Sequence, residues 1–321
     1  MSNIKIVTAF FDIGRESFEK YPRSNQQYLD YFGFWARIQN ELVVYCAPEN
    51  ADAIFKIRQN YGLADKTTVI PIDDVFSIEA KMYQKMLKIE NDVSFQDFRY
   101  RYHDPTNYAD YDYIVLLKTY FMNEVAKRSK DYDYIAWIDF GFNHGGEVYT
   151  CSDDFDFLWD EDFPQKVRLF CLNDPQKLSL IDSLQFQYDC VMGCTIVSPK
   201  SLCSTLWESN KRAMLSLIDN GVIDDDQHIM LMAYKMDPEM FYIKIGNWFA
   251  DFQHLGFSVY CSKKQPQKSN ENHKSKSNNT IKKIIRKSKW CYKRITDPSY
   301  PKANKSSFIE RMENKEKKYY G

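Results

Sequence analysis

Residues 134–144 read Tyr134-Ile135-Ala136-Trp137-Ile138-Asp139-Phe140-Gly141-Phe142-Asn143-His144. The first five residues are apolar or aromatic, and a run of this length suits a buried strand. Asp139 follows where that strand ends, and the glycine two positions later lets the backbone turn. In open α/β sheets, ligands bind outside the carboxyl ends of the strands. Asp139 therefore either holds a divalent metal or a ribose at that edge, or merely begins a turn.

Strand-like and helix-like segments alternate over the first 260 residues. Ser24 and Gln27 form a capping box at the start of one expected helix, and the run 224–227 opens another. A helical stretch from 78 to about 128 is expected to break near Pro105. This alternation is typical of an α/β fold with a mostly parallel sheet flanked by helices. Strands are expected at 4–11, 42–46, 67–72, 134–138, 167–172, 189–198, 241–245 and 257–261.

The charge of the chain is divided unevenly along its length. The whole sequence of 321 residues has a formal net charge of −1. Residues 263–321 carry 18 Lys+Arg and 5 Asp+Glu, whereas residues 1–262 carry 25 and 39. Such a split indicates an acidic body and a basic tail with its own partner. We therefore expect a globular domain over 1–262 and a basic, partly disordered extension over 263–321, with an amphipathic helix at 281–295.

The composition also bears on where the protein works. The N-terminus has no secretory signal pattern, and no segment approaches the roughly 20 apolar residues that span a bilayer. Eight irregularly spaced cysteines indicate reduced thiols in the cytosol. The acidic body argues against a nucleic-acid partner, which the basic tail alone would favour. We expect a cytoplasmic protein that is peripheral on the inner face of the membrane.

Other polar residues have patterns that suit a site. Asp224, Asp225 and Asp226 begin a helix, where one acid serves as the cap and another suits a general base toward an acceptor hydroxyl. Gly193 lies inside an expected strand, which suggests the close approach of a ligand or of another backbone. Lys118, with Arg15 from a different segment, either contacts phosphate groups or is simply solvated. These residues are our candidates besides Asp139.

A divalent metal would need more ligands than Asp139. Two carboxylates at Asp-X-Asp spacing can share such an ion, but position 141 is Gly, and the same spacing recurs by chance in this acidic chain. We predict His144 and His254 as the further ligands and Mg²⁺ or Mn²⁺ as the ion. His254 belongs to the aromatic segment 247–254, which suits either sugar stacking or core packing.

Several segments in this order resemble the WlaTC/HtrL (YibB-like) family of bacterial glycosyltransferases. The specific ones are Val7–Arg15 (VTAFFDIGR), within the resembling stretch Ile6–Arg15, and Trp137–Gly141 (WIDFG). Leu117-Lys118, Gly193 and the run 224–227 follow the same order. The resemblance covers roughly residues 3–260. It implies a GT-A-like fold, with a nucleotide-binding half on the first strands and an acceptor half after the strand of Asp139. By resemblance, Thr8, Phe10 and Arg15 line the nucleotide pocket, Asp139 takes the metal position, Gly193 lies under the donor sugar, and Asp225 or Asp226 is near the acceptor.

These observations predict a glycosyltransferase. It would move a sugar from a nucleotide-diphosphate donor to a hydroxyl of a surface glycan or a lipid-linked oligosaccharide, a substrate class that comes from the family resemblance. Asp225 or Asp226 would be the base if the reaction inverts the anomeric centre, and would orient the acceptor if it retains. The alternative is a non-catalytic nucleotide-sugar-binding or scaffold protein of polysaccharide assembly, because the second carboxylate is missing.

The basic tail generates the first testable prediction. A basic residue near anionic lipid contributes about 1 kcal/mol, so part of the tail charge is enough to hold the chain at a membrane. We expect the full chain, but not a 1–262 truncation, to cosediment with vesicles containing phosphatidylserine. Vesicles of phosphatidylcholine alone serve as the control. Equal sedimentation of the two chains with anionic vesicles would contradict the prediction.

Overall fold

The computed structural model describes residues 2–102 and 104–259. The predicted tail over 263–321 and its helix at 281–295 lie outside the described residues, so the division of the chain at 262 stays a prediction. Within the described ranges, no helix combines the length and the apolar character needed to cross a membrane.

One sheet of seven strands organises the described chain, in the order β3-β2-β1-β4-β6-β5-β7. β1 pairs in parallel with β2 and β4, β2 with β3, and β5 with β7. β6 runs antiparallel between β4 and β5. Six strands therefore share one direction. The strands are β1 (Ile4–Phe10), β2 (Leu42–Cys46), β3 (Thr67–Pro71), β4 (Tyr134–Ile138), β5 (Val167–Cys171), β6 (Val191–Pro199) and β7 (Phe241–Ile245).

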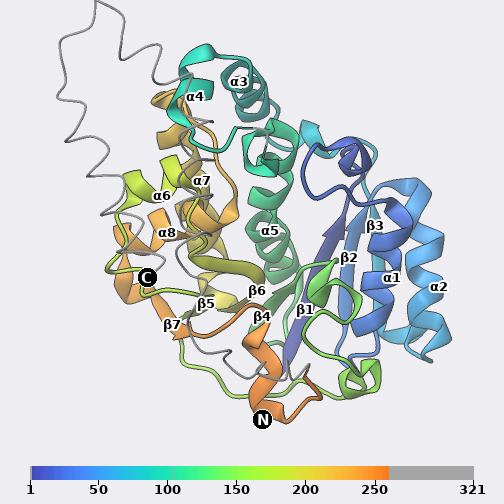
Figure 1. Ribbon diagram of the computed structural model, residues 1–321. Coiled ribbons are helices and arrows are strands. Elements are labelled where there is room, and N and C mark those ends of the chain that lie inside the picture. The colour runs from blue at the N-terminus through green and yellow to red at the C-terminus, as the bar shows by residue number, and fades with distance from the viewer. Residues whose placement is uncertain (1, 103, 260–321) are drawn as a thin grey trace, which may run out of the picture. The chain divides into compact units, whose positions relative to one another are not determined.

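Helices cover both faces of this sheet. α1 and α2 lie on one side of β1 and β2, and α5 lies on the other (Figure 1). α5 packs on β1 and β4 and also contacts α3, α7 and α8. The helices are α1 (Asn25–Trp35), α2 (Ala51–Asn60), α3 (Ala80–Glu90), α4 (Val93–Phe98), α5 (Ala109–Arg128), α6 (Leu180–Phe186), α7 (Cys203–Asp219) and α8 (Asp226–Met236).

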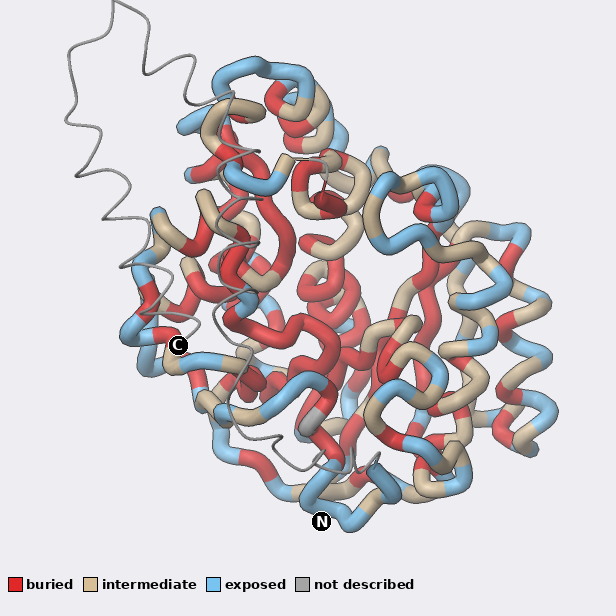
Figure 2. Tube along the Cα trace, in the orientation of Figure 1, coloured by how far each residue is buried: buried red, intermediate tan, exposed pale blue. Residues whose placement is uncertain are grey.

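The central strands are buried along their whole length, as the red tube through the middle of Figure 2 shows. Alternation along β4 directs Ala136 and Ile138 into the cluster that contains Phe32 and Trp35 of α1. Trp137, between them, faces α5 instead, with Lys118 of that helix 6.0 Å from its ring centroid. A sheet covered on both faces explains why its central strands read as nearly continuous apolar runs.

The predicted α/β architecture is confirmed, as a mostly parallel sheet flanked by helices. The capping box at Ser24 forms with both of its hydrogen bonds, and a short 3-10 turn at Pro105–Asn107 separates α4 from α5 as expected. One expected strand is not formed in the described part of 257–261. There, Val259 makes a single bridge to Tyr149, because Phe257 packs into an aromatic cluster with Tyr149 and Phe155 rather than along a sheet edge.

Candidate functional site

A cavity of about 520 Å³ opens at the carboxyl ends of β1 and β4, beside the start of α8. This volume falls within the roughly 300–1,000 Å³ that is typical of ligand sites. The parallel strands β1 and β4 end at the same edge of the sheet, which is where α/β folds place their ligands. Of the predicted site residues, the cavity is lined by Phe10, Arg15, Lys118, Asp139, His144, Gly193, Asp225 and Asp226.

Two predicted site residues do not line this cavity. Thr8 is fully buried within β1, and its hydroxyl has no hydrogen-bond partner among the described residues. His254 pairs with Glu161 instead, at 2.9 Å from Nε2 to the carboxylate. Phe10 does line the cavity, but its ring stacks on Phe140 with centroids 4.7 Å apart, so it forms part of a packed wall. We leave Thr8 and His254 out of the proposed site.

Asp139 faces the cavity, and its side chain is 33% exposed. Its backbone amide donates to the carbonyl of Cys194 at 2.8 Å, so the residue is still held by the β4–β6 ladder. Its Oδ1 accepts hydrogen bonds from the Trp137 indole at 2.6 Å and from Lys118 Nζ at 2.8 Å. Two donors on one oxygen fix the direction of this carboxylate.

Lys118 joins Asp139 to Asp226. It projects from the middle of α5, is 6% exposed, and places Nζ 2.6 Å from Asp226 Oδ2 and 3.0 Å from the carbonyl of Gly193. Together with Asp139, these groups accept all three of its ammonium hydrogens. Burial opposes the charge of Lys118, but the charges of Asp139 and Asp226 outweigh it and raise the pKa of the ammonium above its ordinary value. The lysine is therefore a fixed internal cation.

The glycine at position 193 makes room for that arrangement. A Cβ atom added to Gly193 would lie 1.8 Å from Asp226 Oδ2, far inside any permitted contact. The sequence indicated a close approach here, and the group that approaches is the carboxylate of Asp226 rather than a backbone segment. The register between β5 and β6 also shifts next to Gly193, at Leu169/Phe170.

Asp225 differs from Asp226 in its surroundings. It is the N-cap of α8, where its Oδ1 accepts from the backbone amide of Gln227 at 3.0 Å. Burial and the neighbouring charge of Asp224 raise the pKa of Asp225 to about 7. No lysine or arginine forms an ion pair with it among the described residues. Asp225 thus lines the cavity as a carboxyl group that changes charge near neutral pH.

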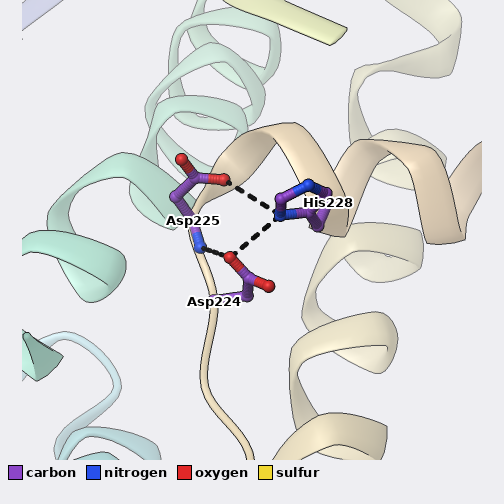
Figure 3. Close-up of side chains that lie close together, drawn as sticks. All are labelled: Asp224, Asp225 and His228. Atoms are coloured by element: carbon purple, nitrogen blue, oxygen red, sulfur yellow. Dashed lines mark hydrogen bonds and ion pairs between the residues drawn. The ribbon is translucent and has the colours of Figure 1, made fainter. Parts of the chain in front are cut away.

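Behind Asp225 lies a network that the sequence did not reveal. Asp224 accepts from His228 Nδ1 at 3.0 Å, as Figure 3 shows. It also accepts from Arg99 Nη1 at 2.9 Å, and all three residues are buried. Burial works against a charged imidazole, but Asp224 outweighs it and raises the pKa of His228 to about 9. Asp112 of α5 is also buried, with no hydrogen-bond partner among the described residues.

The Asp224–Asp225–His228 group has the composition of a metal site. Among the described residues, it is the one set of three or more such side chains whose ligand atoms lie within 4.8 Å of one another. Both imidazole nitrogens are engaged, however, since Nδ1 faces Asp224 and Nε2 lies 2.9 Å from the carbonyl of Tyr188. An imidazole that donates from both nitrogens has no lone pair for a metal. We interpret the group as a buried ion network.

The predicted metal ligands do not assemble around Asp139 either. His144 lines the cavity, but its Nδ1 lies 2.5 Å from Glu147, and burial lowers its pKa. Gly141 offers no carboxylate, and a side chain there would press on Tyr28 at 3.1 Å. In addition, Oδ1 of Asp139 is already occupied by two donors. The side chains present therefore do not fit a divalent ion at Asp139.

Arg15 supplies a buried positive charge with no carboxylate partner among the described residues. It is 7% exposed, and its Nη2 donates to the carbonyl of Tyr21 at 3.1 Å. The guanidinium lies 5.0 Å from the ring centroid of Tyr111 and 5.2 Å from that of Phe18, and its Nε has no hydrogen-bond partner. A buried guanidinium in this state is suited to an anionic ligand, above all a phosphate or carboxylate.

The turn after β4 is held in an unusual conformation. Asn143 and His144 both have left-handed backbone angles, with φ of 58° and 43°. The side chain of Asn143 compensates by bonding to the backbone amides of Val148 and Tyr149 and to the carbonyl of Tyr149. Strained backbone of this kind is concentrated at functional sites. The turn closes one side of the cavity beside Asp139.

Fold and cavity together define an α/β protein whose mostly parallel sheet carries a pocket of fixed charges at the carboxyl ends of its strands. Residues 2–256 match the model of the family described as bacterial protein of unknown function (HtrL_YibB), and the chain belongs to that family. It is 27% identical to Protein HtrL of Escherichia coli (strain K12) over 270 residues, which cover 78% of this chain and 92% of the relative.

Two solved structures are similar to this chain over 74% of its length. The first is the apo form of mouse xyloside xylosyltransferase 1, with a TM-score of 0.38 and 14% sequence identity over 74% of this chain and 84% of that chain. The second is PaToxG glycosyltransferase, with a TM-score of 0.35 and 10% sequence identity over 74% of this chain and 70% of that chain. These scores are too low for either likeness to bear on what this chain does.

The contact between Gly193 and Asp226 generates a prediction about stability. We expect Gly193→Ala to lower the free energy of unfolding by about 1–3 kcal/mol, because the new methyl group must displace the Asp226 carboxylate from Lys118. Chemical denaturation measures the change. Gly33→Ala in α1 is the matched control, since nothing lies within 4 Å of its added Cβ and alanine favours a helix. A Gly193→Ala protein as stable as the parent would show that the site adapts freely.

Proposed function

We propose that the chain is a glycosyltransferase that moves a sugar from a nucleotide-diphosphate donor to a hydroxyl of a surface glycan or a lipid-linked oligosaccharide. The observation that carries the proposal is the pairing, in one cavity, of a buried guanidinium that has no carboxylate partner with a carboxylate at the end of a central strand. Arg15 suits the diphosphate, and Asp139 suits the ribose or the reacting end of the donor. The acceptor class rests on the family resemblance.

The reaction that fits these residues is a direct displacement. The acceptor oxygen forms a bond to the anomeric carbon while the bond from that carbon to the diphosphate oxygen breaks. Asp225 takes the proton of the acceptor hydroxyl, and the nucleoside diphosphate leaves with the bonding electron pair. Arg15 offsets the charge that develops on the leaving diphosphate. We choose Asp225 over Asp226 as the base because Lys118 already holds the Asp226 carboxylate.

The predicted Mg²⁺ or Mn²⁺ has no place in this reaction scheme, because the side chains around Asp139 do not fit it. The cytoplasmic location and the contact of the basic tail with an anionic membrane remain parts of the proposal. A tail held at the membrane would bring the cavity to a lipid-linked acceptor.

A screen of nucleotide sugars tests the proposal directly. We expect a UDP-, GDP-, ADP- or dTDP-linked sugar to raise the melting temperature of the full chain, because a ligand that binds only the folded state stabilises it. Transfer of the sugar that binds is then followed with Asp139→Asn, which we expect to lower the rate by roughly a hundredfold. Asp219→Asn, an exposed change at the end of α7, is the control.

Each outcome of this screen has a separate meaning. Transfer at the parent rate by Asp139→Asn would contradict the role of that carboxylate. Binding of a donor without hydrolysis or transfer to any acceptor would favour the second candidate, a nucleotide-sugar-binding or scaffold protein. The absence of Asp from position 141 is the observation that keeps this candidate in view. If no nucleotide sugar binds, both candidates fail.

The raised pKa of Asp225 predicts a pH dependence. Below about pH 7 the carboxyl group keeps its proton and does not accept another, so kcat/KM is expected to rise with pH and to level off above about 7. Asp225→Asn should lower the rate by roughly 10²–10⁴-fold and remove this limb of the profile. Asp219→Asn should keep both the rate and the limb. An Asp225→Asn protein with the parent profile would assign the proton to another group.

A further inference from the structure

The groups around Lys118 are arranged like the ligands of a cation site, and the ammonium of Lys118 is the cation. Nζ lies 2.8 Å from Asp139 Oδ1, 2.6 Å from Asp226 Oδ2 and 3.0 Å from the carbonyl oxygen of Gly193. Three oxygens, two of them from carboxylates, are the ligands that a hard divalent cation takes in proteins. Here an ammonium group occupies the space between them, and the three oxygens accept its three hydrogens.

Two features of the sheet allow this contact. Gly193 has no Cβ, so the Asp226 carboxylate can lie against the backbone of β6. A Cβ atom at position 193 would be 1.8 Å from Asp226 Oδ2. Trp137 donates to the same oxygen of Asp139 at 2.6 Å, which holds that oxygen toward Lys118. Lys118 itself is 6% exposed and cannot turn to solvent without leaving two carboxylates unpaired. The position of the Lys118 ammonium is therefore fixed by three oxygen contacts and by burial.

A divalent ion at Asp139 would have to share these oxygens with the ammonium. Its double charge would stand next to the single charge of Lys118, in a site that is partly shielded from water, and the two would repel each other. Asp139 Oδ2 accepts no hydrogen bond from the described residues, but one carboxylate oxygen is a small share of the ligands that Mg²⁺ requires. His144 has its Nδ1 directed to Glu147, and His228 has both imidazole nitrogens engaged.

The same cavity contains arginine side chains that are suited to the negative charge of a diphosphate. Arg15 is buried there with an unpartnered Nε, and Arg23 and Arg101 also line the cavity. Arginine binds phosphate oxygens through pairs of hydrogen bonds and keeps its charge under all ordinary conditions. The tasks that a metal performs for a nucleotide-diphosphate donor are therefore divided between Lys118, which neutralises the carboxylates, and arginine, which binds the phosphates.

We propose that Lys118 takes the place of a divalent metal, and that this chain binds its nucleotide-diphosphate donor without one. This inference rests on the proposed function, since it concerns how that donor is held. It differs from what the family resemblance implied for Asp139, which was a metal ligand.

The first experiment uses the full chain, dialysed against EDTA. The dissociation constant of the nucleotide sugar that gives the largest thermal shift is measured by titration calorimetry in EDTA and again with excess MnCl₂ or MgCl₂. We expect equal affinities in the three conditions. Binding that is lost in EDTA and restored by either metal would overturn the inference while leaving the proposed function intact. If neither nucleotide sugars nor inorganic pyrophosphate bind in any condition, the proposed function fails and the inference fails with it.

The second experiment removes the internal cation. Lys118→Met keeps the length of the side chain but leaves Asp139 and Asp226 without their partner. We expect it to weaken donor binding in EDTA by roughly tenfold or more, the loss expected for a charge-assisted contact. Mn²⁺ should recover part of this loss, so that donor affinity depends on the metal in the variant but not in the parent.

Lys127→Met is the matched control on the same helix, where the lysine is exposed and pairs with Glu124. It should bind the donor like the parent in every buffer. Lys118→Met with parent affinity in EDTA would overturn the inference. If Lys118→Met does not fold, the comparison of the parent with and without metal still decides the question, since it needs no substitution.

Discussion

The structure of the site depends on the hydrogen bonds that Lys118 makes to Asp139 and Asp226. They connect the middle of α5, the end of β4 and the start of α8 at one point beside the bare backbone of Gly193. Two carboxylates this close repel each other unless a cation lies between them, and a buried lysine is unfavourable unless it is paired. The charges of these three side chains are therefore stable at this place only as a set. The packing of α5 and α8 on the sheet brings them into contact.

A second set of charges determines how Asp225 behaves. Arg99 and His228 each donate a hydrogen bond to Asp224, whereas Asp225 accepts from the backbone and side-chain amides of Gln227 and has His228 Nδ1 only at 3.8 Å. Three consecutive acids consequently have three different roles. Asp224 is part of a buried ion pair, Asp225 has a pKa raised to about 7, and Asp226 is bound to Lys118. The same residue type acquires different chemistry because its neighbours differ.

The cavity contains positively charged side chains where a metal ion from solution would otherwise supply the charge. The turn at Gly141, where a second carboxylate would complete a metal site, is packed against Tyr28 instead. Arg15 and Lys118 reach the cavity from the loop after β1 and from α5. On the proposal made here, the protein supplies as fixed side chains the positive charge that nucleotide-sugar chemistry otherwise draws from a bound ion. The cations are then in place before the donor arrives.

The sequence by itself determined the order of strands and helices, the mostly parallel sheet, and the edge of that sheet at which Asp139 lies. These properties follow from local patterns, namely apolar runs, a capping box and a glycine after a strand, and each acts over a few residues. Only the tertiary structure decided that Lys118 binds Asp226, 108 residues away, and that Arg99 binds Asp224, 125 residues away. No local pattern records such contacts, because they arise only when segments that are distant in the chain pack together in the folded protein.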